Sequence, residues 1–424
     1  MKRSLTFYWI LPVLAVFSIV SCKKDKSLGY TPGTGAPTIT KVQTVNKYVA
    51  DTVLQSTTTY NSSGIATTTV DTNFNHKSLT ALDSTTVTGN LGNMYRITGT
   101  NLGSATKLTI NGVTVYFNRA WGSDNTIIFT LPTNIPYVQP QSNTMVVTTL
   151  HGAVSYKFTT LPPPPTILQV TDFDFWSGSQ ITLTGKGFAS VTDIKLQTTG
   201  DEVSIVSQND STLVLQMPSS STVTESPLLF TYTSGSNTGA KTASTAVFND
   251  LDNAYTIYFK DSFQNSWGDN SWSHPSGSQT GTPHAFGGTS SIEASYPAGA
   301  WQIEGWANWW PGFAYDASYK YLTFWVKGGK ATHTLVLVGD KMVGGYGQVQ
   351  NANAYAGQLV TVPAGVWTFV KIPLAPPSTA FSSTSTLLNY WANGSTANQL
   401  GFFLQGQSGD VNETMYFDEV AFVK

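Results

Sequence analysis

Two stretches of the chain, ITGTNLGSATKLTI at residues 97–110 and LTGKGFASVTDIKL at residues 183–196, repeat one pattern at an offset of 86 residues. Each holds a strand-like run, a Thr-Gly pair, a turn and a second strand-like run. The offset continues without a gap to SDNTIIFTLP at residues 123–132 and NDSTLVLQMP at residues 209–218. Short strands separated by turn residues are typical of β-sandwiches. The sequence therefore predicts two tandem all-β domains, at residues 37–162 and 163–249.

The first of these two units is longer than the second. Its additional Thr-rich stretch, residues 51–71, predicts a β-hairpin whose turn is Asn61-Ser62-Ser63-Gly64. A run of four prolines, residues 162–165, predicts a stiff spacer between the two units.

The openings of the two units match each other as well. PTITKV at residues 37–42 and PTILQV at residues 165–170 precede the Thr-Gly pairs, and a proline closes each matched segment at Pro132 and Pro218. With these marks both units resemble IPT/TIG domains. The resemblance implies an immunoglobulin-like β-sandwich for each.

The composition changes after Asp250. Nine of the 12 tryptophans fall between Trp267 and Trp391, and strand-like runs continue to the end of the chain. Residues 250–424 are therefore predicted to form a third, larger β-sandwich, of the jelly-roll kind seen in carbohydrate-binding modules.

The first residues have the pattern of a bacterial lipoprotein signal. Lys2 and Arg3 precede an apolar run at residues 5–20, which is shorter than the ~20 residues of a membrane-spanning helix. The run ends in Ile-Val-Ser-Cys, and Cys22 is the only cysteine of the chain. We expect residues 1–21 to be a signal peptide, Cys22 to carry lipid, and residues 22–36 to form a tether. The alternative is a plain secretory signal with an incidental cysteine.

Composition excludes several classes of protein. Charged residues make up 11% of the chain and the formal net charge is −2, which gives no electrostatic support for nucleic-acid binding. One cysteine excludes an intrachain disulfide framework, and five scattered histidines do not favour a zinc site.

The aromatic residues of the C-terminal region divide by their sequence surroundings. Trp301, Trp325 and Trp367 lie in strand-like runs and are predicted to be core residues. The others lie in loop-like, Gly-, Asn- and Pro-rich surroundings, where exposed aromatic rings indicate a binding site. The predicted site aromatics are Trp267, Trp272, Trp306, Trp309, Trp310, Tyr346 and Trp391.

Flat aromatic rings suit the C–H faces of a pyranose, while polar side chains hydrogen-bond the hydroxyls at its rim. By analogy with base stacking, each stacked sugar contributes ~1–3 kcal/mol. Asn308, Lys341 and Gln348 are the predicted rim partners.

Together, the lipoprotein signal, the tandem IPT/TIG-like units and the Trp-rich last domain resemble type B surface glycan-binding proteins of Bacteroidetes-type polysaccharide utilisation loci. The resemblance implies a non-catalytic lipoprotein of the outer membrane that faces outward and binds xyloglucan or a related β-glucan. It also implies a TonB-dependent transporter and its lid-like glycan-binding partner as partners. Residues 23–26, Lys-Lys-Asp-Lys, depart from the acidic residues that the family carries there.

Two other functions stay open from the sequence. One is a surface adhesin or structural protein that binds a protein partner. The other is a glycoside hydrolase, which needs two carboxylates ~5–10 Å apart; the candidates include Glu293, Glu304, Glu413 and Glu419. We assign no catalytic residue, no cofactor and no metal ligand, although a structural Ca²⁺ held by Asp261 and Asp418 is a further candidate.

Overall fold

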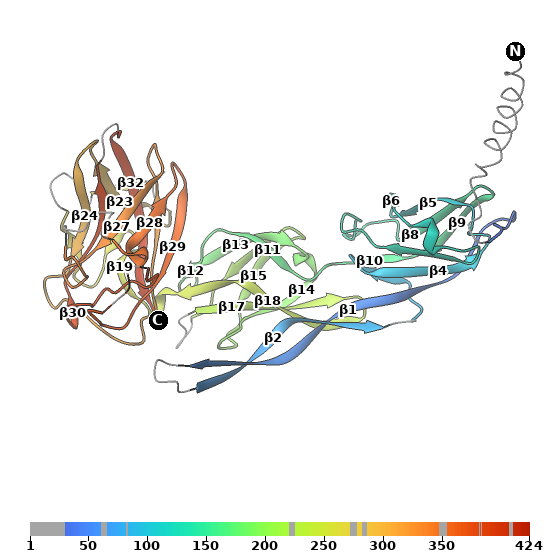
Figure 1. The fold of residues 1–424 in the computed structure, drawn as a ribbon, viewed down its shortest axis with the longest axis horizontal. Helices are drawn as coiled ribbons and strands as arrows, with labels where there is room; N and C mark the ends of the chain where they lie inside the picture. Colours follow the sequence, from blue (N-terminus) through green and yellow to red (C-terminus); the bar gives the residue numbers. More distant parts are fainter. Residues whose placement is uncertain are drawn as a thin grey trace, which may run out of the picture. The chain divides into compact units, whose positions relative to one another are not determined.

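The computed structural model describes ten ranges of the 424-residue chain, namely 30–60, 66–81, 84–219, 225–271, 278–281, 286–346, 354–380, 382, 384–406 and 410–424. The chain forms two compact units. One contains the first repeat, and the other contains the second repeat together with the C-terminal domain (Figure 1). Cys22 and the predicted signal peptide lie outside the described residues. In the described part of the chain, no helix has the length and apolar character that a bilayer crossing requires.

The first repeat is a sandwich of two four-stranded sheets with an apolar core between them. One sheet has the order β2 (Ala66–Ala81), β1 (Thr38–Tyr60), β4 (Met94–Thr100), β7 (Thr126–Thr130). The other has the order β6 (Val113–Val115), β5 (Ala105–Ile110), β8 (Thr144–Thr149), β9 (Gly152–Lys157). A parallel pair, β3 (Thr88–Asn90) and β10 (Thr159–Leu161), and the 3₁₀ turn η1 (Arg119–Trp121) complete it. Inward residues alternate along β4, as a sheet with one buried face requires.

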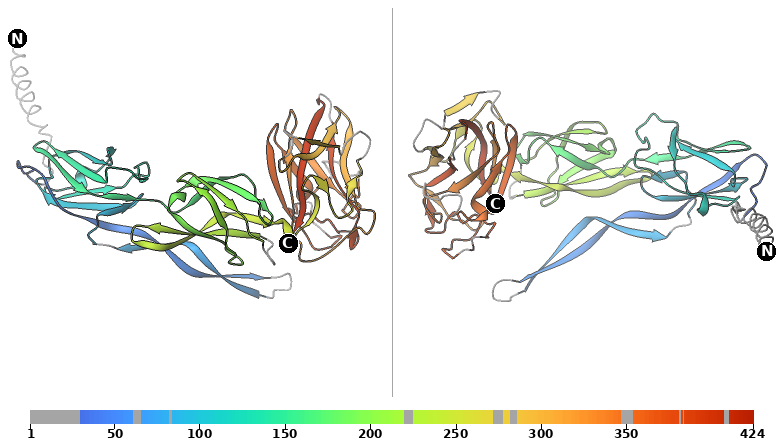
Figure 2. Two further views of the ribbon diagram at one scale, coloured as in Figure 1. Left: turned by 180° about the vertical axis from the view of Figure 1, so that it is seen from behind. Right: turned by 45° about the horizontal axis from the view of Figure 1, so that its top comes forward.

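The predicted hairpin is confirmed, and it is longer than the Thr-rich stretch. β1 and β2 pair antiparallel from Asn46 opposite Ala81 to Tyr60 opposite Ala66. Within the described residues β2 has no other strand partner, and Figure 2 shows the two strands leaving the sandwich as a ribbon. The predicted turn residues lie outside the described residues.

The second repeat reproduces the central strands of the first. Its sheets have the orders β11 (Thr166–Val170), β13 (Gln180–Lys186), β16 (Thr212–Gln216), β15 (Ser204–Gln208) and β12 (Asp174–Phe175), β18 (Asn237–Asp250), β17 (Glu225–Ser234), β14 (Val191–Leu196). β13, β14 and β16 begin 86 residues after β4, β5 and β7. The 3₁₀ turns are η2 (Phe188–Ser190) and, at the end of the domain, η3 (Leu251–Asn253).

The repeated Thr-Gly pair has a structural cause. A Cβ atom on Gly99 would lie 1.9 Å from the Thr38 carbonyl oxygen, and one on Gly185 would lie 2.0 Å from that of Thr166. Opposite each glycine the first strand of the sandwich changes register, between Ile39 and Lys41 in one repeat and at the equivalent place in the other. Only glycine lets the two backbones approach this closely.

The C-terminal domain is a sandwich of two larger sheets, as predicted. The first has the order β20 (Ser262–Phe263), β19 (Tyr255–Phe259), β32 (Glu413–Val423), β23 (Ser290–Tyr296), β22 (Ser278–Gly281), with β26 (Tyr321–Lys327) paired to β32 and β29 (Trp367–Pro373) paired to β26. The second has the order β21 (Gly268–Asp269), β24 (Trp301–Ala307), β31 (Gln399–Gln405), β27 (His333–Val338), β28 (Leu359–Val362). A short pair, β25 (Phe313–Ala314) and β30 (Thr396–Ala397), and the 3₁₀ turn η5 (Ala356–Gln358) lie in its loops.

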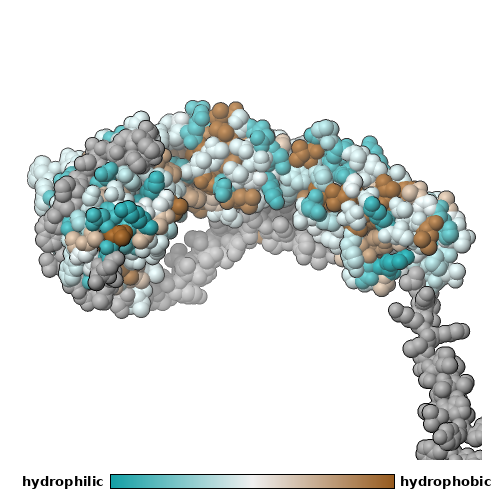
Figure 3. Space-filling view, turned by 90° about the horizontal axis from the view of Figure 1, so that it is seen from above, coloured by the Kyte–Doolittle hydropathy of each residue, from teal (hydrophilic) through white to brown (hydrophobic). Residues whose placement is uncertain are grey.

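The three sandwiches have separate apolar cores, and aromatic residues dominate the last one. The C-terminal core includes Trp306, Phe324, Phe402, Phe417 and Phe422, all fully buried. A small further cluster of Leu251, Phe259, Ala421 and Val423 packs against Trp176 of the second repeat. On the face of the molecule drawn in Figure 3, hydrophobic residues lie in small separate groups among hydrophilic ones.

Candidate functional site

Among the predicted site tryptophans that the structure describes, Trp309 and Trp310 are exposed. Trp309 is 66% exposed and Trp310 is 84% exposed. They follow β24, whose pairing with β31 ends at Ala307 opposite Gln399. Two adjacent indoles in solvent present a large apolar area that the fold does not use.

The loop that carries the two indoles is held at both ends by Asn308. Its backbone N–H donates to the Asn398 carbonyl oxygen (2.8 Å), and its Oδ1 accepts the Gly312 N–H (3.1 Å). Its Nδ2 donates to Tyr255 Oη (3.2 Å) and to the Asn265 carbonyl oxygen (2.9 Å). Asn308 is fully buried, so its predicted role as a glycan rim residue is wrong. It positions the loop instead.

An open hollow of about 630 Å³ begins where this loop ends. Its lining residues are Tyr255, Gly312, Phe313, Ala314, Tyr315, Asp316, Ala317 and Tyr319. The rings of Tyr255 and Phe313 stack at 3.8 Å with an interplanar angle of 9°. The hollow therefore has an aromatic wall close in sequence to the exposed indoles.

Asp316 supplies the one carboxylate among the hollow's lining residues. The Ser318 N–H donates to Asp316 Oδ1 (2.8 Å), and this hydrogen bond lowers the pKa of the carboxyl below its usual value. Asp316 is therefore ionised at neutral pH and accepts hydrogen bonds only. Hydroxyl groups of a neutral ligand suit such an acceptor, whereas an anionic ligand does not.

Sequence reasoning missed the tyrosines of this hollow. They lie in FAYDASYKY at residues 313–321, where Tyr315 and Tyr319 are spaced four residues apart. The density of tyrosine in a polar segment just after the Trp-Trp pair was the available signal.

Three predicted site tryptophans are core residues, and the prediction that they face solvent is wrong. Trp306 lies between the two sheets against Phe402, and its indole N–H donates to Glu304 Oε1 (2.9 Å). Trp267 is 5% exposed and donates to Tyr255 Oη (3.1 Å). Each indole N–H has a hydrogen-bond partner, which is what burial of tryptophan requires.

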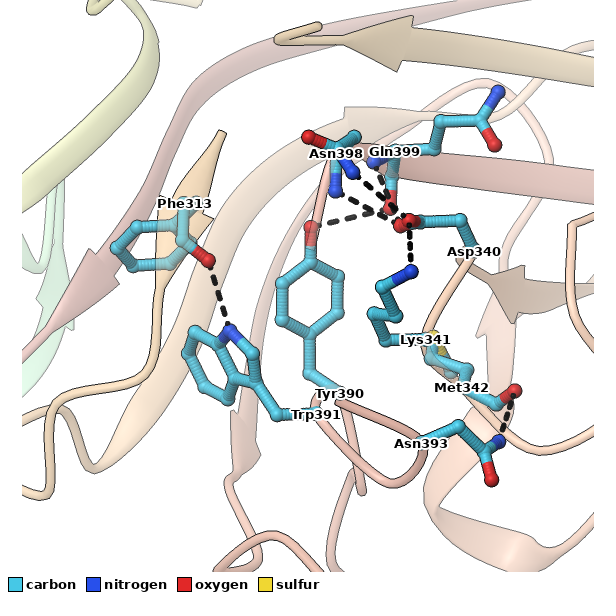
Figure 4. Close-up of polar contacts among 9 residues, drawn as sticks. All are labelled: Phe313, Asp340, Lys341, Met342, Tyr390, Trp391, Asn393, Asn398 and Gln399. Carbon is cyan, nitrogen blue, oxygen red and sulfur yellow. Dashed lines mark hydrogen bonds and ion pairs between the residues drawn. The ribbon is translucent and has the colours of Figure 1, made fainter. Parts of the chain in front are cut away.

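Trp391 is the third of them. Its ring is fully buried next to Phe313, and its N–H donates to the Phe313 carbonyl oxygen (3.0 Å), as Figure 4 shows. The turn-like sequence that follows Trp391 suggested exposure, but the ring points inward.

Trp301 shows the opposite error, because it was predicted to be core and is 50% exposed. It shares a strand face with Ile303, as predicted, but this face points away from the main core. A small separate cluster covers it, with Ile303, Val336, Val338 and Phe403 buried and Tyr346 packed against them. Trp301 lies at its edge, with its ring edge-on to Phe403.

Tyr346 is half-buried over that outer face. Its hydroxyl donates to the Asn270 carbonyl oxygen (3.0 Å), and its ring occupies the space above two glycines, Gly305 and Gly401. Burial raises the pKa of its hydroxyl above the ordinary value, so it is a neutral hydrogen-bond donor. Tyr346 covers a sheet face here and is only partly available to a ligand.

Lys341 is connected to the loop of Trp309 through Asp340. Lys341 Nζ lies 3.3 Å from Asp340 Oδ2, and Asp340 Oδ1 accepts the backbone N–H groups of Asn398 (2.9 Å) and Gln399 (3.1 Å) (Figure 4). Asn398 in turn accepts the Asn308 N–H. The predicted Lys341 thus belongs to the support of the loop. Trp272 and Gln348, also predicted site residues, lie outside the described residues.

The two carboxylates considered for Ca²⁺ bind backbone N–H groups. Asp261 Oδ1 accepts those of Thr289 (2.7 Å) and Ser290 (2.8 Å). Asp418 Oδ2 accepts those of Phe286 (2.9 Å) and Gly287 (3.1 Å). In the part of the chain that the structure describes, no group of three or more His, Cys, Asp or Glu side chains is placed to hold a metal ion.

Comparison with known protein families identifies the second repeat. Residues 165–247 match the IPT/TIG domain family. An IPT/TIG domain-containing protein of Bacteroides ovatus is 31% identical over 120 residues, which are 27% of this chain and 24% of that protein. The match thus spans about a quarter of the length of the curated relative.

Solved structures give three further similarities, all at low identity. The surface glycan-binding protein PbSGBP-B from Prevotella bryantii is 15% identical, with 93% of this chain and 99% of that chain covered and a TM-score of 0.46. SGBP-B from a complex xyloglucan utilization locus in Bacteroides uniformis is 16% identical, with 79% and 96% covered and a TM-score of 0.35. A Bacteroides ovatus SGBP-B in complex with a mixed-linkage heptasaccharide is 12% identical, with 88% and 82% covered and a TM-score of 0.29.

Proposed function

We propose that the chain binds a neutral polysaccharide through Trp309, Trp310 and the hollow beside them, without catalysing a reaction. The exposure of two adjacent indoles on a loop held at both ends is the observation that carries the proposal. A loop fixed by buried hydrogen bonds loses little conformational entropy when a ligand binds. The indole faces stack on sugar rings, and Asp316 with the Tyr315 hydroxyl hydrogen-bonds their hydroxyl groups.

The experiment is isothermal titration calorimetry on Trp309→Ala and Trp310→Ala. Loss of one stacked ring removes ~1–3 kcal/mol, so each variant is expected to bind about 5- to 150-fold more weakly. Trp121→Ala is the matched control, because Trp121 is 57% exposed but lies in the first repeat. Unchanged affinity in both loop variants would show that the site lies elsewhere.

The ligands for this test are xyloglucan, mixed-linkage β-glucan and a mannan. The first two are chosen because the named glycan-binding proteins come from a xyloglucan locus or bind a mixed-linkage oligosaccharide. Failure of every polysaccharide to bind the folded wild-type chain would favour the adhesin hypothesis instead.

The carboxylates considered for hydrolysis support a non-catalytic function. Glu304 accepts the Trp306 indole N–H, and Glu413 accepts the backbone N–H of Ala331 (2.9 Å) and contacts His333 Nε2 at 3.0 Å. Both side chains are buried and hold the fold together. A reducing-sugar assay on the same three polysaccharides is expected to show no turnover, and any turnover would overturn this part of the proposal.

We further propose that Cys22 carries the lipid that anchors the chain in the outer membrane, with the glycan site facing outward. The lipoprotein-like signal supports this placement. A TonB-dependent transporter with its lid-like partner is the proposed recipient of the captured glycan, as the family resemblance implies.

A further inference from the structure

Three carboxylates meet where the second repeat contacts the C-terminal domain, within one compact unit. Asp172 and Asp174 come from the segment that leads into and forms β12, and Glu419 comes from β32. Asp174 and Glu419 are 1% and 3% exposed. The carboxyl groups of Asp172 and Glu419 lie within hydrogen-bonding reach of each other. Two carboxyl groups form a hydrogen bond only when one of them holds a proton.

Aromatic contacts surround this cluster and join the two domains. Phe173 stacks on Phe369 of β29 at 5.2 Å, and Trp176 lies edge-on to Phe259 of β19 at 5.1 Å. The indole N–H of Trp325 donates to Asp172 Oδ1 (3.1 Å). The carboxylates are therefore enclosed by apolar rings, where charge is costly.

Glu419 reaches the cluster because β32 has a bulge. The pairing of β26 with β32 shifts register, so that Thr323 lies opposite Ala421 but Trp325 lies opposite Asp418. Glu419 has a φ of +49°, in the left-handed region of the backbone that strains a residue other than glycine. The rest of the fold holds this strained position, and the result is a carboxyl group directed at the neighbouring domain.

The neighbouring groups do not neutralise three charges. The one ammonium group that the structure places at Asp174 is that of Lys371, which is also paired with Glu225 and donates to Asn249 Oδ1 (3.0 Å). Asn249 Nδ2 donates to Asp174 Oδ1 (2.6 Å), while no hydrogen-bond partner of Asp174 Oδ2 or Glu419 Oε2 is found among the residues that the structure describes. Further charged groups on the packed elements include Asp418, Asp250, Asp252, Lys260 and Asp261, and Asp418 repels the charged form of Glu419.

We propose that Asp172 and Glu419 share one proton, and that this hydrogen bond locks the second repeat onto the C-terminal domain. The lock does not depend on glycan binding. It fixes the direction in which the C-terminal domain faces relative to the IPT/TIG domain that carries it. Loss of the proton leaves two carboxylates in contact in an apolar junction and releases the lock.

The expected pH dependence follows from the direction of the shifts. Burial raises the pKa of Asp172 to about 6 and raises the pKa of Glu419 and Asp174 well above their usual values. A pKa that is raised in the folded state stabilises the fold fully below the unfolded-state value near 4, and this contribution is lost as the pH rises through the folded-state value. The contribution of Asp172 is therefore largest in acid and is lost by about pH 6, while that of Glu419 is lost at higher pH, where the shared proton leaves.

Differential scanning calorimetry of the full chain between pH 5 and pH 9 tests the lock. In the wild type, the transition temperature of the unit that contains the second repeat and the C-terminal domain is expected to fall by on the order of 5 to 10 °C over this range. Glu419→Gln keeps the side-chain shape and the backbone strain but donates to Asp172 at every pH. It is expected to reduce that fall by half or more and to raise the transition temperature at pH 8.

Two further variants complete the design. Asp172→Asn is expected to reduce the fall in transition temperature in the same way. Glu293→Gln, on β23 of the same domain, should show the same pH dependence of the transition temperature as the wild type. If the transition temperature of Glu419→Gln depends on pH as that of the wild type does, the proposal of a shared proton is wrong. Unfolding of both amide variants at pH 5 would also contradict the proposal, because the contact would then depend on something other than the shared proton.

Discussion

At the scale of single residues, the C-terminal domain shows that sequence surroundings do not determine whether a tryptophan is exposed. Trp306 and Trp309 are three residues apart in one Gly- and Pro-bounded segment, yet one is fully buried and the other is 66% exposed. The difference arises because Trp306 is still in β24 and faces the core, whereas Trp309 lies beyond the last strand pair.

Replacing a buried tryptophan and an exposed one is expected to affect different properties, namely stability and polysaccharide binding. Trp306→Ala is expected to lower the free energy of unfolding by about 3–5 kcal/mol, because it leaves a cavity and removes the partner of Glu304. Trp310→Ala is expected to change it by less than about 0.5 kcal/mol while polysaccharide binding weakens by about 5- to 150-fold. Guanidinium denaturation of both variants measures this contrast. Equal stability losses would mean that Trp310 is packed in solution.

Asn308 tests whether a residue that holds the indole loop, but does not itself contact the ligand, affects binding. Asn308→Ala leaves the Gly312 N–H and the Asn265 carbonyl oxygen without their partner, which costs about 1–3 kcal/mol. Polysaccharide affinity is expected to fall as well, because the indole loop loses its fixed ends.

The control for this variant is Asn393→Ala, whose side chain makes one hydrogen bond, to the Met342 carbonyl oxygen (3.2 Å). Its effects on stability and affinity are expected to be smaller in both measurements. Unchanged polysaccharide affinity in Asn308→Ala would show that the loop keeps its conformation without the hydrogen bonds of Asn308.

At the scale of secondary-structure elements, the internal repeat predicted the strands well. Alternation of apolar residues and the constant offset placed β4, β5, β7 and their counterparts, because one buried sheet face imposes that period on the sequence. The site was predictable only in part. Trp309 and Trp310 were found from their composition, but Asn308 and the tyrosines of the hollow act through tertiary contacts that no local pattern records.

The Thr-Gly pair gives a prediction at this scale. Gly185→Ala places a Cβ atom against the Thr166 carbonyl oxygen, so β11 has to move away from β13, at an expected cost of about 1–3 kcal/mol. Gly239→Ala is the control in the same domain, because a Cβ atom there meets no other atom within 4 Å. Thermal unfolding followed by far-ultraviolet circular dichroism measures the difference. Equal transition temperatures in the two variants would exclude the close approach.

At the scale of the whole molecule, three cores are arranged along one chain, and the predicted lipid would be attached at the end of the chain opposite to the glycan site. Cys22→Ser is expected to move the protein from the detergent phase to the aqueous phase in a Triton X-114 partition of expressing cells. The folded domains, whose first strand begins at Thr38, should keep their polysaccharide affinity. Persistence of the variant in the detergent phase would contradict lipid attachment at this cysteine.

The β1–β2 ribbon of the first repeat has a consequence for how the chain tolerates change. Beyond Asn46 its strands pair with each other, and the chain returns to the sandwich beside its point of departure, where the Thr44 N–H donates to the Ser84 carbonyl oxygen (3.1 Å). A tight turn in place of residues 47–81 would leave every ladder of the sandwich intact. Changes in the length of this ribbon are therefore expected to leave the sandwich beneath it folded.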